Sequence, residues 1–101
     1  MHGRLELQTM LENLLGSQEV YFQPPASVKM QYPAIVYSRN SIDNTHADDD
    51  VYKQSLEYQV IVIDTDPDSE IAMKVSRISR CRYERHYVAD GLNHDVFRLI
   101  Y

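Results

Sequence analysis

The chain has 101 residues, a formal net charge of −5 and a single cysteine. One domain spanning residues 1–101 is expected, and a chain of this length buries roughly 60–70% of its unfolded surface. The negative charge argues against a general nucleic-acid-binding protein, which carries a basic surface. A lone cysteine excludes an internal disulfide and a zinc site of several thiolates. No apolar run approaches a membrane span and no signal-peptide pattern opens the chain, so we expect a protein made in the cytoplasm.

The first expected element is an amphipathic helix over residues 4–15. Its leucines recur near helical spacing, and Gly16 is a natural stop signal. Residues 20–23 predict a short strand, which the adjacent prolines Pro24 and Pro25 end or hold at the edge of a sheet.

An extended segment follows, crossing the surface between residues 25 and 32. Pro33 fixes its own backbone and biases Tyr32 away from helix. Residues 34–41 then predict a strand, because β-branched and aromatic residues are concentrated there.

Residues 42–52 predict a polar, acidic loop of about ten residues, a length typical of functional or disordered loops. Its three consecutive aspartates, Asp48, Asp49 and Asp50, repel one another and favour a solvated tip. Residues 56–65 form the strongest strand pattern in the chain. Both of its faces are apolar, which predicts a central strand covered on both sides.

A second helix is predicted over residues 66–79, with Asp66 as N-cap and Pro67 at the first helical position. The last part of the chain predicts two strands joined at Asp90-Gly91, a strong hairpin signal. The element order predicts a small α+β domain: an antiparallel β-sheet, an N-terminal helix, a second helix packed on the same face, and a C-terminal β-hairpin.

Four residues near the hairpin are of types that bind divalent metals: His86, Asp90, His94 and Asp95. However, the turn already requires Asp90, and adjacent strand residues such as His94 and Asp95 point to opposite faces. We therefore favour polar turn or interface roles and expect no metal site. The aspartate run lacks the residue spacing of a calcium loop.

Cys81 lies between Arg80 and Arg82, whose charges would favour a nucleophilic thiolate. The sequence assigns no base to it, so a partly buried structural cysteine is favoured. No phosphate loop, dinucleotide fingerprint or hydrolase elbow is present, and the chain has three glycines. We expect no enzymatic activity and no cofactor.

Arginines are concentrated just after the second predicted helix, with Glu84 as the one acidic residue among them. The four are Arg77, Arg80, Arg82 and Arg85. Along a strand, Arg80 and Arg82 would project from the same face. One interpretation is a solvated helix end, where basic residues complement the dipole. The other is a salt-bridging surface for an acidic patch, which the Asp48–Asp50 loop of another copy would supply. Such a head-to-tail contact can close into a ring.

Several stretches resemble the small tail-completion (tail-terminator) proteins of long-tailed bacteriophages. They are "YFQPP", "VKMQYPAIVY", the "DNT…DDD" loop, "YQVIVIDTDPDSEI" and "ADGLNHDVFRLIY". The resemblance covers most of residues 20–101 in order. It implies a small α+β protein that forms a ring, commonly hexameric, on the head-proximal end of the finished tail tube. That ring stops tube polymerisation and offers a docking surface to the head's connector complex.

The resemblance implies a location in the virion, at the head–tail junction, after assembly in the host cytoplasm. The implied partners are other copies of the chain, the tail tube protein and the head connector, and no membrane is involved. Genome DNA would pass through the ring lumen without specific binding, and an acidic lumen lined by Asp48–Asp50 would repel its phosphates. The alternative is a head-closure (stopper) protein, which seals the filled head. A metal-dependent nuclease and a free-standing regulatory module are the remaining classes.

The residues expected at interfaces are Phe22, Tyr32, Asp48, Asp49, Asp50, Arg80, Arg82 and Arg85. The three prolines fix the path of a segment whose Phe22 and Tyr32 would dock against a neighbour at reduced entropic cost. The competing interpretation is an ordinary edge loop that closes the core.

Overall fold

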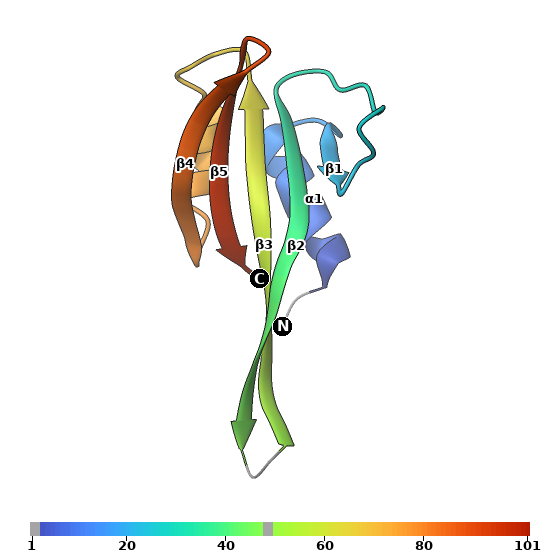
Figure 1. Cartoon of the computed structure of the whole chain (residues 1–101), viewed down its shortest axis with the longest axis vertical. Coiled ribbons are helices and arrows are strands. Elements are labelled where there is room, and N and C mark those ends of the chain that lie inside the picture. Colours follow the sequence, from blue (N-terminus) through green and yellow to red (C-terminus); the bar gives the residue numbers. More distant parts are fainter. Residues whose placement is uncertain (1–2, 48–49) are drawn as a thin grey trace.

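A computed structural model of the chain describes residues 3–47 and 50–101, and for residues 43–54 its description is limited to the backbone (Figure 1). The elements in chain order are α1 (Arg4–Leu15), β1 (Val20–Phe22), β2 (Ala34–Ala47), β3 (Asp50–Asp64), α2 (Glu70–Ser76), β4 (Cys81–Ala89) and β5 (Leu92–Ile100). The strands form one sheet in the order β1-β2-β3-β5-β4. The pairing of β1 with β2 is parallel, and the other neighbours are antiparallel. The predicted α+β fold is confirmed.

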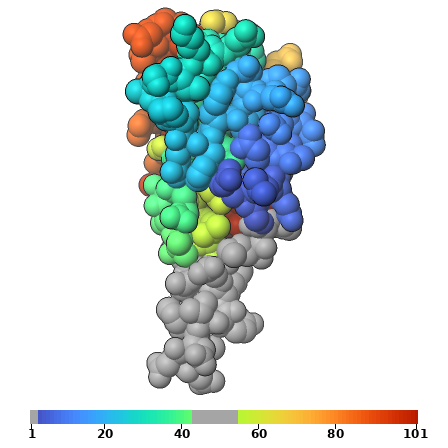
Figure 2. All heavy atoms as spheres, turned by 90° about the vertical axis from the view of Figure 1, so that its right-hand side faces the viewer, coloured from blue at the N-terminus to red at the C-terminus, as the bar shows by residue number. Residues whose placement is uncertain are grey.

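Helix α1 has the predicted bounds and packs its leucines on the sheet. Leu7 and Leu11, one helical turn apart, are fully buried, whereas Leu5 is 70% exposed and does not belong to the buried stripe. Gly16 ends the helix in the left-handed region (φ 81°), where its N–H donates to the carbonyl of Glu12 at 2.8 Å. Figure 2 shows α1 and the following segment lying together on one side of the body.

The core lies between the two helices and one face of the sheet. Its buried side chains are Leu7, Leu11, Val20, Ile35, Tyr37, Tyr58, Val60, Val62, Val75, Phe97 and Leu99. Strand β3 is central, as predicted. Both helices pack on this one face and lie behind the sheet in Figure 1, so no described helix covers the other face of β3. On the other face of β3, Ile61 is half-buried and Ile63 is 8% exposed.

Strands β2 and β3 run through the region predicted to be a polar loop, residues 42–52. Their ladder pairs Ile42 with Leu56 and continues to Ala47 opposite Asp50. The loop prediction was wrong because it weighed polarity alone. Both strands here also contain β-branched and aromatic residues that favour extended backbone, and cross-strand pairing satisfies their peptide groups.

We call residues 42–47 and 50–55 the arm, and the rest of the fold the body. The arm projects from the body in Figure 1, and the molecule measures 51 × 23 × 23 Å. Strand β5 pairs with β3 from Glu57 onward, and β1 pairs with residues 35–37 of β2. In the described ladders, the arm strands therefore pair with each other alone, which leaves their outer backbone groups open to other chains.

Helix α2 is shorter than the predicted helix over residues 66–79 because a different residue caps it. The hydroxyl of Ser69 accepts a hydrogen bond from the N–H of Ala72 at 3.3 Å, as an N-cap does. The carboxylate of Asp66, the predicted N-cap, instead accepts from the N–H of Asp68 at 2.9 Å. This local turn removes Asp66 and the following proline from the helix.

The C-terminal hairpin forms as predicted, with Asp90 and Gly91 as its two turn residues. Both have positive φ, 53° and 72°, the backbone that a two-residue hairpin turn of this kind requires. Among the described residues, no helix has both the length and the apolar character to span a membrane.

We expect Leu11→Ala to lower the free energy of unfolding by about 2–5 kcal/mol, because it leaves a cavity where α1 meets the sheet. Leu5→Ala, on the same helix but at a mostly exposed position, is the matched control and should change it by less than about 0.5 kcal/mol. Urea unfolding followed by circular dichroism measures both. Equal losses in the two variants would contradict the one-sided packing of α1.

Candidate functional site on the open face of the sheet

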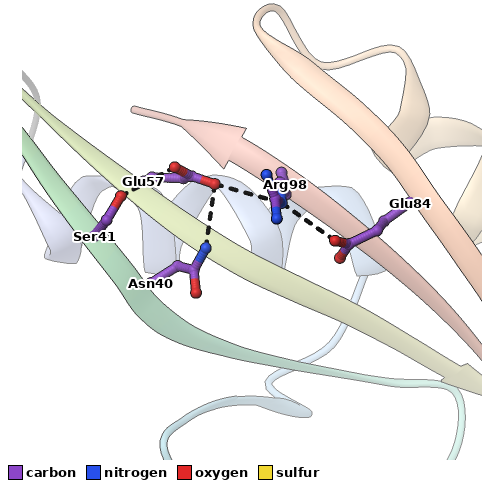
Figure 3. Close-up of polar contacts among 5 residues, drawn as sticks. All are labelled: Asn40, Ser41, Glu57, Glu84 and Arg98. Carbon is purple, nitrogen blue, oxygen red and sulfur yellow. Dashed lines mark hydrogen bonds and ion pairs between the residues drawn. The ribbon is translucent and has the colours of Figure 1, made fainter.

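The face of the sheet opposite the helices, here called the open face, carries a network of polar side chains (Figure 3). Glu57 on β3 lies at its centre and accepts hydrogen bonds from Asn40 Nδ2 at 3.2 Å and Ser41 Oγ at 3.0 Å. Arg98 Nε on β5 lies 3.6 Å from Glu57 Oε1 and 3.2 Å from Glu84 Oε1. In Figure 3, these side chains lie in front of the strands and α1 lies behind them.

Strand register explains why this network forms. Arg82 on β4 is directly opposite Arg98 on β5, so two positive side chains meet on the same face. Like charges directly across a strand pair destabilise a sheet. The carboxylates of Glu57 and Glu84 flank Arg98 on either side and offset that repulsion. Glu84 itself lies at an irregularity in the β4–β5 register, between Tyr83 and Arg85.

A hollow of about 420 Å³ adjoins the network, and we call it the arginine hollow. It is lined by Glu57, Arg80, Cys81, Arg82, Arg98 and Ile100. Arg80 has left-handed backbone (φ 65°), and its carbonyl accepts a hydrogen bond from the Ile100 N–H at 3.2 Å. That bond ties the start of β4 to the end of β5. The structure therefore places both Arg80 and Arg82 beside one concave surface.

Two of the three arginines carry charge that the surrounding structure does not balance. In the part of the chain that the structure describes, Arg98 has the two carboxylate partners given above, whereas Arg80 and Arg82 have no ion-pair partner. Both side chains are exposed. A planar guanidinium suits carboxylate and phosphate groups, because its N–H donors match paired oxygens. The hollow therefore presents two guanidinium groups of the kind that bind anions, without a carboxylate partner among the described residues.

Cys81 also lines the hollow, but its surroundings do not favour a nucleophile. Burial raises the pKa of the Cys81 thiol above its ordinary value of 9.0. The neutral thiol is therefore the dominant form at neutral pH, in spite of the neighbouring arginines. Cys81 packs at the edge of the hydrophobic core, as the structural interpretation of the sequence predicts.

The two histidines of the hairpin do not converge. His86 is paired across the strands with Asp95, and its Nε2 lies 3.1 Å from Asn93 Oδ1. His94 stacks on Tyr87, with ring centroids 4.5 Å apart. Because His94 and Asp95 are adjacent on β5, the pairing places the two histidines on opposite faces of the sheet. No three His, Cys, Asp or Glu side chains within the described residues gather in a group that suits a metal ion.

Phe22 and Tyr32, both expected at an interface, lie in different environments. The Phe22 ring packs 5.0 Å from that of Tyr37, and the Arg4 guanidinium lies over it at 4.5 Å. Phe22 is thus part of the edge of the core. Tyr32 is 42% exposed and projects from a loop that the Glu19 carboxylate holds. Of the pair, Tyr32 is the side chain that is available to a partner.

The remaining expected interface residues are Arg85 and the three aspartates. Arg85 is exposed on β4, with its guanidinium 5.6 Å from the centre of the Tyr87 ring. Asp48 and Asp49 lie outside the described residues. Asp50 opens β3, and its side chain is likewise outside the description.

Sequence reasoning missed Glu57 and Arg98, which organise the open face. A signal was present in each case: a charged residue within a strongly apolar strand pattern. Such a residue must either reach solvent or find an opposite charge on a neighbouring strand. What the sequence could not supply was the strand order, which places β5 between β3 and β4 and so brings Arg98 between two glutamates.

A second hollow of about 310 Å³ lies between α2 and the β4–β5 hairpin. Two exposed side chains on its rim, Met73 and Tyr83, give it apolar character, and the Tyr83 hydroxyl donates a hydrogen bond to Asp95 at 3.0 Å. Comparison with known proteins adds no assignment for either hollow: no protein-family model and no curated protein matches this sequence.

We expect Glu57→Ala to lower the free energy of unfolding by about 1–2 kcal/mol, because Asn40 and Ser41 lose their acceptor and Arg98 loses a carboxylate. Glu84→Ala is the matched control, since it removes the other carboxylate partner of Arg98 from a more exposed position. The Glu84 side chain is 30% exposed, against 17% for Glu57, and its loss should cost about 0.5 kcal/mol or less. Chemical denaturation distinguishes them, and a larger loss in Glu84→Ala would contradict the central role of Glu57.

Proposed function

We propose that this protein is a tail terminator of a long-tailed bacteriophage, a structural protein that caps the head-proximal end of the tail tube. The proposal rests on the resemblance of residues 20–101 to that family. The structural observation that supports it best is the arm, which extends from a small body and has unpaired strand edges. A subunit that assembles into a ring needs two different surfaces that complement each other, and a projecting hairpin can supply one of them.

Charge supports a role beside DNA without specific DNA binding. The chain carries a net charge of −5, and its acidic excess lies wholly within residues 1–65. In a ring through which the genome passes, a negative subunit keeps phosphates from adhering to the wall. The proposed partners are other copies of the chain, the tail tube protein on one side of the ring and the head connector on the other.

Phage that lack this gene provide a test of the terminator proposal. We expect electron microscopy of their lysate to show tails of excess and irregular length beside DNA-filled heads, because polymerisation of the tube has lost its stop. Supplying the gene from a plasmid is the control and should restore uniform length.

Two other outcomes would each overturn the terminator proposal. Free tails of normal length beside leaking or emptied heads would assign the protein to head closure. Intact infectious particles would contradict both roles at the head–tail junction.

Tyr32→Ala tests the proline-rich segment as a docking surface. Because Tyr32 is 42% exposed, we expect the variant to keep its free energy of unfolding within about 0.5 kcal/mol and to lower the yield of joined particles in complementation. Phe22→Ala, at the edge of the core, should destabilise the fold instead, by about 2 kcal/mol or more. Full complementation by Tyr32→Ala would show that the segment only closes the core.

A further inference from the structure

We propose that the arginine hollow receives the acidic turn of a second copy of this chain, residues Asp48–Asp50, so that subunits join head to tail. This inference rests on the proposed ring and specifies one of its contacts. It concerns a site on the body, beside the root of the arm, and an occupant at the far end of the arm of a neighbouring subunit.

The arginine hollow carries arginine charge that no carboxylate of the described residues balances. Glu57 and Glu84 hold Arg98, whereas Arg80 and Arg82 are unpaired among the described residues. The site therefore has more positive than negative charge. The volume of the hollow, about 420 Å³, gives space for an acidic segment of another molecule. Carboxylates bound by paired guanidinium groups form charge-assisted hydrogen bonds, stronger than neutral ones.

The acidic group that matches the hollow is present in the sequence itself, and a second copy of the chain would supply it. The one run of three acidic residues in the sequence is Asp48–Asp50, which follows Ala47, the last residue of β2, and ends at Asp50, the first residue of β3. The turn of the same molecule does not reach the hollow. Asp50 precedes Glu57 by seven positions in β3, and at about 3.3 Å per residue the two lie about 23 Å apart. The acidic turn of another copy has no such restriction.

The hollow lies where the body meets the arm. Its lining residues are Glu57 of β3 and residues from the end of β5 and the start of β4, including Arg80 just before β4. They lie at the level where Glu57 begins the β3–β5 ladder. Below that level, β3 continues into the arm without β5 beside it. Figure 1 shows β4 and β5 ending at this level while the arm continues. An incoming hairpin can therefore reach the hollow along the arm, where no described strand is in its way.

DNA is the competing occupant, and the observations favour protein. A groove that follows nucleic acid presents a basic stripe, whereas here two unpaired arginines lie beside two glutamates in a chain of net charge −5. A compact turn with three carboxylates matches a site of this size and charge. Under this proposal, Asp48–Asp50 contact a neighbouring subunit and do not line the lumen.

A charge swap tests the contact. One full-length variant carries Arg80→Glu and Arg82→Glu, and the other carries Asp48→Arg, Asp49→Arg and Asp50→Arg. In each variant alone, the turn and the hollow have the same sign of charge. We expect the dissociation constant for self-association to rise about 30-fold or more relative to wild type, as attractive pairs become repulsive. An equimolar mixture restores opposite signs at every contact and should associate again, as measured by sedimentation velocity at low ionic strength.

A matched control separates this contact from net charge. Arg39→Glu with Lys74→Glu makes the same change in charge as Arg80→Glu with Arg82→Glu, at two exposed residues outside the hollow, and it should associate as wild type does. Circular dichroism confirms that every variant folds. A mixture that stays monomeric, or a control that loses association equally, would overturn the proposal.

Binding to a 30-base-pair DNA duplex tests whether DNA, and not a second subunit, occupies the arginine hollow. In one outcome, the DNA affinity of Arg80→Glu/Arg82→Glu falls while that of the Arg39→Glu/Lys74→Glu control does not. Together with a monomeric mixture, that result assigns the hollow to phosphate and overturns the subunit contact. Failure of this proposal is distinguishable from failure of the terminator role. Overlong tails in phage lacking the gene, combined with a monomeric mixture, would leave the terminator role standing and reject this contact.

Discussion

The packing of both helices on one face of the sheet is the constraint on which the rest of the structure depends. Leu11 of α1 and Val75 of α2 are fully buried against a face that includes Val60 and Phe97. Residues 3–47 and 50–101 form two layers, the sheet and the helices on one face, so no helix of the described chain lies over the opposite face. Every charged residue that alternates with the core positions must therefore be accommodated on that open face, by solvent or by other charges.

That alternation links the core to the candidate site. Glu57 precedes the buried Tyr58, and Arg98 lies between the buried Phe97 and Leu99, so the residues that make the core also place these two charges outside it. The register then brings Arg82 opposite Arg98, and the glutamates on either side neutralise one arginine. The unpaired charge of Arg80 and Arg82 is thus a consequence of strand order and pairing, and it remains available to a partner.

Local patterns were sufficient to predict most of the fold. The spacing of leucines and Gly16 defined α1, and Asp90-Gly91 defined the hairpin, because both signals depend on neighbouring residues. The arm was missed because polarity predicts solvent exposure and an exposed hairpin is as polar as a loop. The site was missed because it combines side chains from β3, β4 and β5, whose order no local pattern contains. The prediction did place Arg80 and Arg82 together, since both lie in one short segment.

The separation of charge along the molecule determines what kind of assembly it favours. Asp50 and Glu57, at opposite ends of the arm strand of β3, lie about 23 Å apart at about 3.3 Å per residue. A two-fold dimer can pair the same charges only if its arms lie antiparallel, so that the acidic segment of each copy meets the hollow of the other. Pairing the turn of one copy with the hollow of the next uses different patches and leaves one of each free at the ends of the chain of subunits. For the head-to-tail contact that we propose, the angle at which the arm enters the hollow would decide whether subunits close a ring and of what size.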